Sequence, residues 1–487
     1  MRAWMKRLSC GLLAALMLLS VTGCKKGGSD GENSENIQLK VYDGEEPEDL
    51  GGYVFKVIDF SNNRWNRENN GTPYYDAWHQ VLNEVEGLYN CKIELETVSL
   101  DELFNKMQPE VMAGEKFADL VCATQWAFGK LIGANLLRPL NTLEDVNWDN
   151  AWWNQNIREI STINKGTMAA NGSFIFDAAT TYVMFYNEDI WNELQLPDPY
   201  DLVNSGKWTI DRMREYCKKA MRDNDGDGAV TSKEDRWGLI TPNGDFSRAL
   251  YFALGGHFFQ NDENGHVQLA CKNEKTYAIV EKMYTLVQQD KSVCRAEFDG
   301  WEDLANAFLR GNGLFLSATL DSPVLKDMES DWGAMPLPKM DESQEQYLSG
   351  VDHNSTVCGV PSTNDNVHEV GVIMEALGRH ATILEDIYWP DYENTFWRHA
   401  EDAEIVANHV VKHGQYDLAV LMQNCNNAFS APMSRVFATA FGNSGNDFSS
   451  YIESVEDVIN TTIAEYFDYT PSGEDSGETT EPTDAAE

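Results

Sequence analysis

Residues 53–60 read YVFKVIDF, residues 93–97 read IELET and residues 120–123 read LVCA, three short stretches with the composition of strands. Two helices are indicated between them. Residues 72–89 open with a threonine and a proline, a frequent helix start, and continue with apolar side chains at helical spacing, as do residues 103–111. The order strand, helix, strand, helix, strand predicts a parallel sheet covered by helices, and therefore an α/β fold.

The composition is that of an acidic globular protein. Its 487 residues include 37 lysines and arginines against 78 aspartates and glutamates, a formal charge of -41 at neutral pH. Because phosphate binding needs a basic surface, this charge excludes nucleic acid as an expected partner. The length suggests two or three core-bearing units. Aromatic residues make up 11% of the chain, more than a core usually needs, so some are expected to line a ligand cleft.

The amino terminus predicts export. Basic residues precede an apolar run at 12–19 that is too short to span a bilayer, which is typical of a secretion signal. Residues 21–24 read VTGC and resemble the bacterial lipobox. The resemblance implies that Cys24 becomes the lipidated, palmitate-bearing mature terminus, and the acyl chains would hold the protein on the extracellular face of the cell membrane. The alternative is an ordinary signal peptide with an incidental cysteine.

The cysteines do not indicate a disulfide framework. Of the nine, Cys10 falls in the signal and Cys24 in the lipobox. The remaining seven are an odd set without a C-x-x-C pair. We expect them to be buried thiols that act as small apolar side chains.

The centre of the chain contains the most recognisable segments. Residues 182–191 read YVMFYNEDIW and run from a strand into a helix, and residues 207–209 read KWT before another helix. Together with WWNQ at 152–155, the helix and strand at 301–318 and the GVP turn at 359–361, they resemble family 1 extracellular solute-binding proteins, the group that contains maltose-binding protein. The resemblance covers roughly the whole mature domain.

This resemblance implies a type II periplasmic-binding-protein-like fold. Such proteins have two α/β lobes joined by hinge strands, bind a solute in the interlobe cleft and deliver it to an ABC importer. The third hinge crossing is expected close to Ala400. The predicted parts are a signal peptide at 1–23, a flexible tether at 24–51, a first lobe at 52–176 and about 357–400, a second lobe at 177–356 and about 401–467, and a disordered acidic tail at 468–487.

One motif predicts a metal site. Residues 223–234 read DNDGDGAVTSKE and satisfy every specified position of the EF-hand loop, with Gly228 at the sharp turn. Because carboxylates held so close repel one another, a bound cation explains their clustering. We expect a structural calcium ion, and the alternative is a solvated turn. The expected ligands are Asp223, Asp225, Asp227, Ala229 through its carbonyl, Thr231 and Glu234.

Other signals are weaker. His409 and His413 could share a helical face, but zinc would need further ligands, so no zinc site is expected. The sequence contains no Walker motif, no G-x-S-x-G elbow and no complete dinucleotide fingerprint. Trp78 and Trp301 lie at helical spacing and are expected in the core.

Candidate ligand contacts follow from the fold class. Open α/β sheets bind ligands beyond the carboxyl ends of their strands, so residues in those loops are the candidates. Each could equally be a rim residue with local hydrogen bonds. The candidates are Arg64, Trp65 and Trp126 in the first lobe, and Asp177, His257, Asp321 and His353 in the second lobe and hinge.

The favoured interpretation is a monomeric, lipid-anchored receptor that captures a carbohydrate for an ABC permease and is not an enzyme. Aromatic faces stack on sugar rings, and aspartate, asparagine and histidine bind hydroxyls. A peptide or polyamine receptor is the alternative that the acidic charge favours. A secreted acidic glycoside hydrolase and a purely structural surface protein are the other hypotheses. Oligosaccharide turnover would select the hydrolase, and a thermal-shift response to any small solute would argue against the structural protein.

The lipobox generates a first prediction. Cys24→Ala removes the sulfur that would carry the diacylglyceryl group, so the protein should move from the membrane fraction to the medium or remain unprocessed. Fractionation and immunoblotting of cells expressing each form measure this. Normal processing with unchanged membrane association would contradict the prediction.

Overall fold

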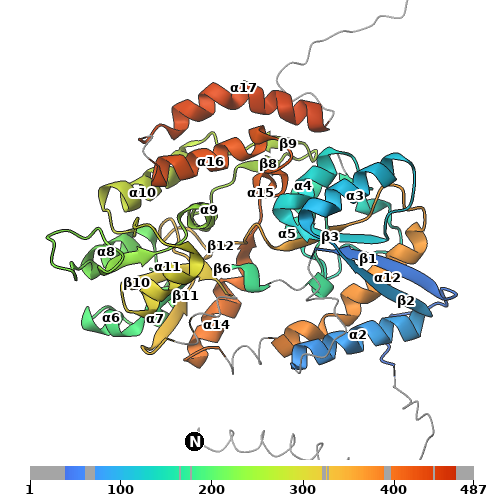
Figure 1. Ribbon diagram of the computed structural model, residues 1–487, viewed down its shortest axis with the longest axis horizontal. Coiled ribbons are helices and arrows are strands. Elements are labelled where there is room, and N and C mark those ends of the chain that lie inside the picture. Colours follow the sequence, from blue (N-terminus) through green and yellow to red (C-terminus); the bar gives the residue numbers. More distant parts are fainter. Residues whose placement is uncertain are drawn as a thin grey trace, which may run out of the picture. The chain divides into compact units, whose positions relative to one another are not determined.

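The computed structural model describes most of the chain between residues 39 and 467 (Figure 1). The predicted signal peptide, Cys24 and the acidic tail lie outside these residues. None of the helices within them is long and apolar enough to cross a bilayer. The described ranges are 39–60, 72–163, 166–175, 178–320, 325, 328–388, 396–442 and 445–467.

The first sheet has the strand order β13, β3, β1, β2. β1 (Tyr53–Asp59) runs parallel to both β2 (Cys91–Thr97) and β3 (Leu120–Thr124). β13 (Thr356–Gly359) joins the sheet from far along the chain and runs antiparallel to β3. The parallel βαβαβ unit predicted from periodicity is therefore confirmed.

Helices cover both faces of this sheet. Because side chains alternate along a strand, Phe55 and Val57 of β1 pack with α2 and α12, whereas Ile58 packs with α3 and α4. α3 begins at a capping box, in which the Ser99 N–H donates to the Glu102 carboxylate. The helices of this half are α2 (Pro73–Tyr89), α3 (Leu100–Met112), α4 (Gln125–Gly133), α5 (Gln155–Ser161) and α12 (Val367–His380).

The second sheet has the order β11, β6, β10, β7. β10 (Gly313–Thr319) is antiparallel to β6 (Tyr182–Asn187) and parallel to β7 (Trp237–Ile240). β11 (Trp332–Met335) is antiparallel to β6 at one edge. All four strands are almost completely buried, so both faces of this sheet are also covered.

On one face of the second sheet Val183 and Phe185 pack with α11 and α14, and on the other Met184 packs with α8. The β8–β9 hairpin, β8 (Phe259–Asn261) and β9 (Val267–Leu269), lies between α9 and α10 in the chain. The helices of this half are α6 (Glu188–Glu193), α7 (Pro199–Asn204), α8 (Ile210–Ala220), α9 (Asn243–Ala253), α10 (Glu274–Tyr284), α11 (Gly300–Leu309) and α14 (Ala400–His409).

Three carboxyl-terminal helices contact both halves. α15 (Leu418–Met422) packs on α4 of the first half, and α16 (Asn427–Phe441) packs on α9 and α10 of the second and on α17 (Phe448–Phe467). One hydrophobic cluster consequently runs from the first sheet through α4 and α15 to the second. The α4–α15 contact is close because Gly129 lies against the backbone of Leu421 and Met422.

The chain passes between the two sheets through short crossing segments. It leaves the first half after Ile175 and enters β6 at Tyr182, and it returns between Gly350 and Thr356. Before the return, β12 (Ser349–Gly350) pairs in parallel with β14 (Gly414–Gln415). The residues expected at the third crossing lie partly outside the described residues. The numerical lobe boundaries given above stay predictions.

Two expectations about single residues are wrong. Trp78 is buried as expected, but Trp301 is 38% exposed, because it stands in the first turn of α11 while that helix buries Leu304 and Phe308. α14 ends at His409, so His413 lies in the following short 3-10 turn and the two histidines do not share a helical face.

The α4–α15 contact generates a second prediction. A Cβ at Gly129 would overlap the Leu421 carbonyl oxygen and approach the Met422 Cα to 2.9 Å, so Gly129→Ala should lower the melting temperature although alanine is the better helix former. Gly244→Ala in α9 is the matched control, since a Cβ added at Gly244 would point into open space. Because Gly244 lies in the first turn of α9, this change should leave the melting temperature unchanged or raise it slightly. A Gly129→Ala protein as stable as the wild type would contradict this packing.

Candidate functional site

The structure describes three of the seven candidate ligand residues, Trp126, His257 and His353. Arg64, Trp65, Asp177 and Asp321 lie outside the described residues and stay predictions.

Two of the three described candidates lie together. Trp126 is the second residue of α4, directly beyond the carboxyl end of β3. Its backbone N–H donates to the His353 carbonyl oxygen at 3.3 Å, and its indole Nε1 donates to the Asn354 side chain at 3.1 Å. Trp126 and His353 are half-buried. A residue of the first half therefore contacts the second crossing segment at the strand ends.

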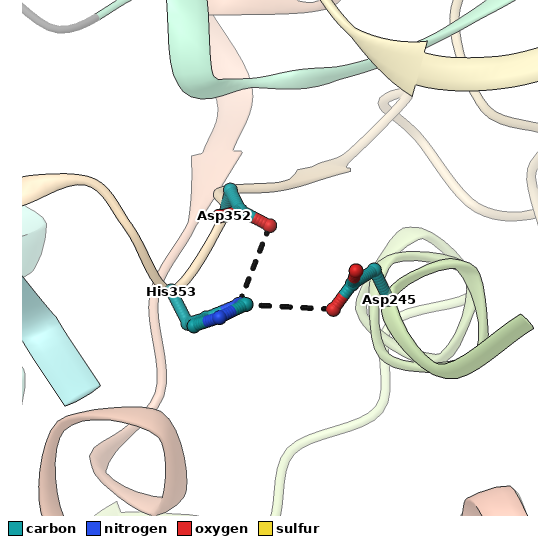
Figure 2. Close-up of side chains that lie close together, drawn as sticks. All are labelled: Asp245, Asp352 and His353. Atoms are coloured by element: carbon teal, nitrogen blue, oxygen red, sulfur yellow. Dashed lines mark ion pairs between the residues drawn. The ribbon is translucent and has the colours of Figure 1, made fainter. Parts of the chain in front are cut away.

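His353 belongs to a cluster of side chains from the second crossing segment and from α9 of the second half (Figure 2). Its Nδ1 lies 3.7 Å from the Asp245 carboxylate and 3.4 Å from the Asp352 carboxylate. Arg248, one turn along α9 from Asp245, places its Nη2 3.1 Å from Asp245, 3.2 Å from Asp352 and 2.8 Å from His353 Nδ1. The hydroxyl of Tyr182 donates to Asp352 at 2.8 Å.

The inner part of this cluster is buried and the outer part is accessible. The side chains of Arg248 and Asp352 are each 8% exposed, whereas Asp245 is 38% and His353 27% exposed. Burial alone would raise the pKa of Asp352, but the neighbouring His353 and Arg248 outweigh it and hold that pKa well below its usual range. Asp352 is therefore the charged anchor of the cluster.

The hydrogen bonds define what the cluster offers to a ligand. Whatever its protonation state, the imidazole ring of His353 carries at least one N–H group that can donate. The site thus presents an N–H donor on His353, a carboxylate acceptor on Asp245 and the indole face of Trp126. Ligands with hydroxyl groups, which donate and accept, and an apolar ring face suit these groups.

A metal is not needed to explain this cluster. The ligand atoms of Asp245, Asp352 and His353 lie within 4.8 Å of one another, a spacing that a cation could use. The Arg248 guanidinium already lies within hydrogen-bond distance of all three and neutralises one carboxylate charge.

His257 lies elsewhere. It lines a second pocket with Glu159, Asn261 and Tyr416, and its Nδ1 is 4.0 Å from the buried Asp417 carboxylate. Burial lowers the pKa of His257, and burial raises the pKa of Asp417 to about 7. The structure therefore does not bring His257 together with Trp126 and His353.

Another pocket lies on the opposite face of the crossing segments. Its volume is about 290 Å³. Thr181 and Val351 pair directly and line it, whereas the next residues, Tyr182 and Asp352, bond to each other in the cluster. Because successive residues of extended chain point to opposite sides, the pocket and the cluster lie on different faces. Its other lining residues include Trp152, Asn154, Asn171 and Tyr416.

The sequence reasoning missed Asp245 and Arg248. Both follow closely on β7, as Trp126 follows β3, so the same rule about carboxyl strand ends could have found them. Asp352 and Tyr182 carry no such signal, because their roles depend on the long-range approach of β6, α9 and the second crossing.

The predicted calcium loop connects α8 to the start of β7. Carboxylate oxygens of Asp223, Asp225 and Asp227 lie within 4.8 Å of one another. The backbone N–H groups of Gly226 and Gly228 donate to Asp223, and both glycines have positive φ, 78° and 95°, which side-chain-bearing residues rarely adopt. The three aspartates thus have the donor chemistry that calcium prefers.

The loop is fixed from inside by Asp235. This carboxylate is fully buried and accepts backbone hydrogen bonds from Asn224, Thr231 and Ser232 at 2.9 Å each. Burial raises the pKa of Asp235, but these hydrogen bonds lower it by more than burial raises it. The side chain therefore stays charged. Glu234 stands outside the three-aspartate group and is exposed.

Comparison with known proteins identifies the class. The sequence profile of the bacterial extracellular solute-binding proteins matches residues 69–375. The chain belongs to this family. A comparison with curated protein sequences finds no match.

Solved structures agree with the fold. The substrate-binding protein Lmo0181 of Listeria monocytogenes, in complex with cycloalternan, is 15% identical, with 85% of this chain and 99% of that one covered and a TM-score of 0.52. UspC of Mycobacterium tuberculosis is 14% identical, with 84% and 99% covered and a TM-score of 0.55. The cyclic α-maltosyl-1,6-maltose-binding protein of Arthrobacter globiformis is 13% identical, with 85% and 100% covered and a TM-score of 0.55. With the family match, these confirm the predicted two-lobe type II fold.

The loop geometry generates a third prediction. If Asp223–Glu234 binds calcium, the ion should raise the melting temperature, because a ligand at 100 times its dissociation constant stabilises the folded state by about 2.7 kcal/mol. Chelation or Glu234→Gln should reverse the effect, whereas Glu263→Gln, in the exposed β8–β9 turn, should not. Identical calorimetric melts with excess calcium and with chelator would contradict calcium binding.

Proposed function

We propose that this solute-binding protein captures an uncharged, hydroxyl-rich solute, a sugar or oligosaccharide, and delivers it to an ABC importer. The observation that supports the proposal is the hydrogen bond from Trp126, in the first half, to His353 of the Asp245–Arg248–His353 cluster. This contact lies at the carboxyl ends of β3 and β7. A site built from both halves binds its ligand most tightly when the halves close on it.

The chemistry of the site favours hydroxyl groups. The Asp245 carboxylate can accept from one sugar hydroxyl while a ring N–H of His353 donates to a neighbouring one. The indole of Trp126 offers a flat apolar face to the C–H groups of a sugar ring. Of the three solved structures named above, Lmo0181 is in complex with cycloalternan and the Arthrobacter protein is named for cyclic α-maltosyl-1,6-maltose, which supports this ligand class.

The environments of the carboxylates in the cluster disfavour a glycoside hydrolase. A hydrolase needs a carboxylic acid whose pKa is raised so that it can protonate the leaving group. Asp352 has its pKa lowered, and both Asp352 and Asp245 are paired with Arg248. A binding role, in which the carboxylates stay charged acceptors, fits these environments better.

The peptide or polyamine receptor remains an alternative because the chain is strongly acidic. At the cluster, however, Arg248 offsets one of the two carboxylates and reduces the attraction for a cation. We further propose that the protein is a monomer anchored by lipid at Cys24, and that calcium at Asp223, Asp225, Asp227, Ala229, Thr231 and Glu234 has a structural role.

The fourth prediction tests the ligand site. A thermal-shift screen of sugars, oligosaccharides, peptides and polyamines should find a stabilising carbohydrate. Trp126→Ala should weaken its binding by about 1–3 kcal/mol, as expected for an aromatic anchor. Asp245→Asn should cost about 1.5–3 kcal/mol, because a hydrogen bond to a charged acceptor is lost. Neither change should greatly alter the melting temperature, since both side chains are half-buried.

Trp152→Ala is the matched control, because Trp152 lines the pocket on the opposite face. Titration calorimetry on the three variants measures the affinities. If Trp152→Ala abolishes sugar binding and Trp126→Ala does not, the ligand site has been placed on the wrong face. Stabilisation by polyamines or peptides alone would reject the carbohydrate.

A further inference from the structure

We infer that Cys122 and Cys358 form a disulfide bond between β3 and β13 when the protein folds in an oxidising medium. All seven described cysteines carry thiols in the structure. Cys122 and Cys358 are directly opposite in the register of the antiparallel β3–β13 pair. Among the cysteines that the structure describes, they alone occupy opposed positions in a strand pairing.

The hydrogen-bond phase brings these two side chains together. The Cys358 N–H donates to the Ala170 carbonyl at 2.8 Å, and the Cys358 carbonyl accepts from the Ala170 N–H at 2.9 Å. Both backbone groups of Cys358 therefore point away from β3, so Cys122 and Cys358 are a non-hydrogen-bonded pair. In such pairs the Cα atoms are about 4.5 Å apart and the side chains are at their closest.

This geometry meets the requirement for a disulfide. Bridged cysteines have Cα atoms about 4.4–6.8 Å apart, so a non-hydrogen-bonded antiparallel pair falls within the range without backbone movement. Directly opposed residues also point to the same face of a sheet. Cys122 and Cys358 both belong to the cluster under α2 and α12, and both are 0% exposed.

The compartment supplies the oxidant. Members of this family are extracellular, and extracellular proteins fold where disulfide-bearing oxidants are present. The Cys122 thiolate attacks such a disulfide and releases one thiolate, and the Cys358 thiolate then attacks the Cys122 sulfur and releases the second. Two protein thiols are oxidised, one external disulfide is reduced to two thiols, and the two protons pass to the released thiolates.

Burial restricts when the bond can form. Once β13 has docked on β3 the two sulfurs are covered, so the exchange must occur during folding and not in the native protein. The completed bond would join segments far apart in the sequence, at the strand that receives the second crossing. It would therefore restrict the unfolded chain and stabilise the fold.

The experiment refolds the denatured, reduced protein with oxidised and reduced glutathione, alkylates it, and maps unreduced peptides by mass spectrometry. A peptide pair joined through Cys122 and Cys358, with an intact mass lower by about 2 Da before alkylation, is the expected result. Recovery of both cysteines as alkylated or glutathionylated thiols, or bonded to other cysteines, would overturn the inference.

Variants give an independent readout. Cys358→Ala and Cys122→Ala should abolish the mass loss, whereas Cys294→Ala, a buried cysteine of the second half, should retain it. Unfolding in the presence of a reductant should lower the melting temperature of the oxidised wild type and leave that of Cys358→Ala unchanged. If the alanine variants fail to fold, the wild-type peptide map alone decides the question.

Discussion

The antiparallel pairing of β3 with β13 is the constraint on which the candidate site depends. Its register places Thr356 opposite Thr124, so the residues before β13 meet the residues after β3. Ser355 and His353 then accept backbone hydrogen bonds from Gln125 and Trp126. This one pairing, between strands far apart in the sequence, thus fixes the second crossing segment against the first half. It also places His353 beside Trp126.

Electrostatics explains why this crossing is held by an arginine. Asp352 is buried, and a buried carboxylate stays charged only where hydrogen bonds or a neighbouring cation offset the loss of water. Arg248 supplies the cation from α9 and bonds to Asp245 and His353 with the same Nη2. The crossing is consequently fixed to the second half by the same group that orients Asp245 and His353, the two accessible side chains of the cluster.

Local sequence pattern predicts the parts of the fold that depend on neighbours in the chain. Periodicity was sufficient for β1, β2 and β3, because each buries side chains against helices that adjoin it in sequence. The pattern could not predict the position of β13 in the sheet, because its pairing with β3 joins segments far apart in the sequence. Trp301 shows the limit for single residues, because helical spacing does not reveal which end of a helix leaves the core. His413 shows the same limit, because spacing does not reveal where α14 ends.

The same distinction applies to the candidate site, where residues at strand ends are predictable and long-range contacts are not. Trp126 follows from the rule about strand ends, and so could Asp245, but the Asp352–Arg248–His353 contacts require α9 and the crossing to meet. β7 links this site to the predicted calcium loop. Its start is tied to the loop by the Trp237 Nε1 bond to the Ser232 carbonyl at 2.9 Å, and its other end leads into α9. Because the loop is tied to β7 and lies away from the candidate site, an ion bound in the loop would act on stability rather than directly on ligand affinity.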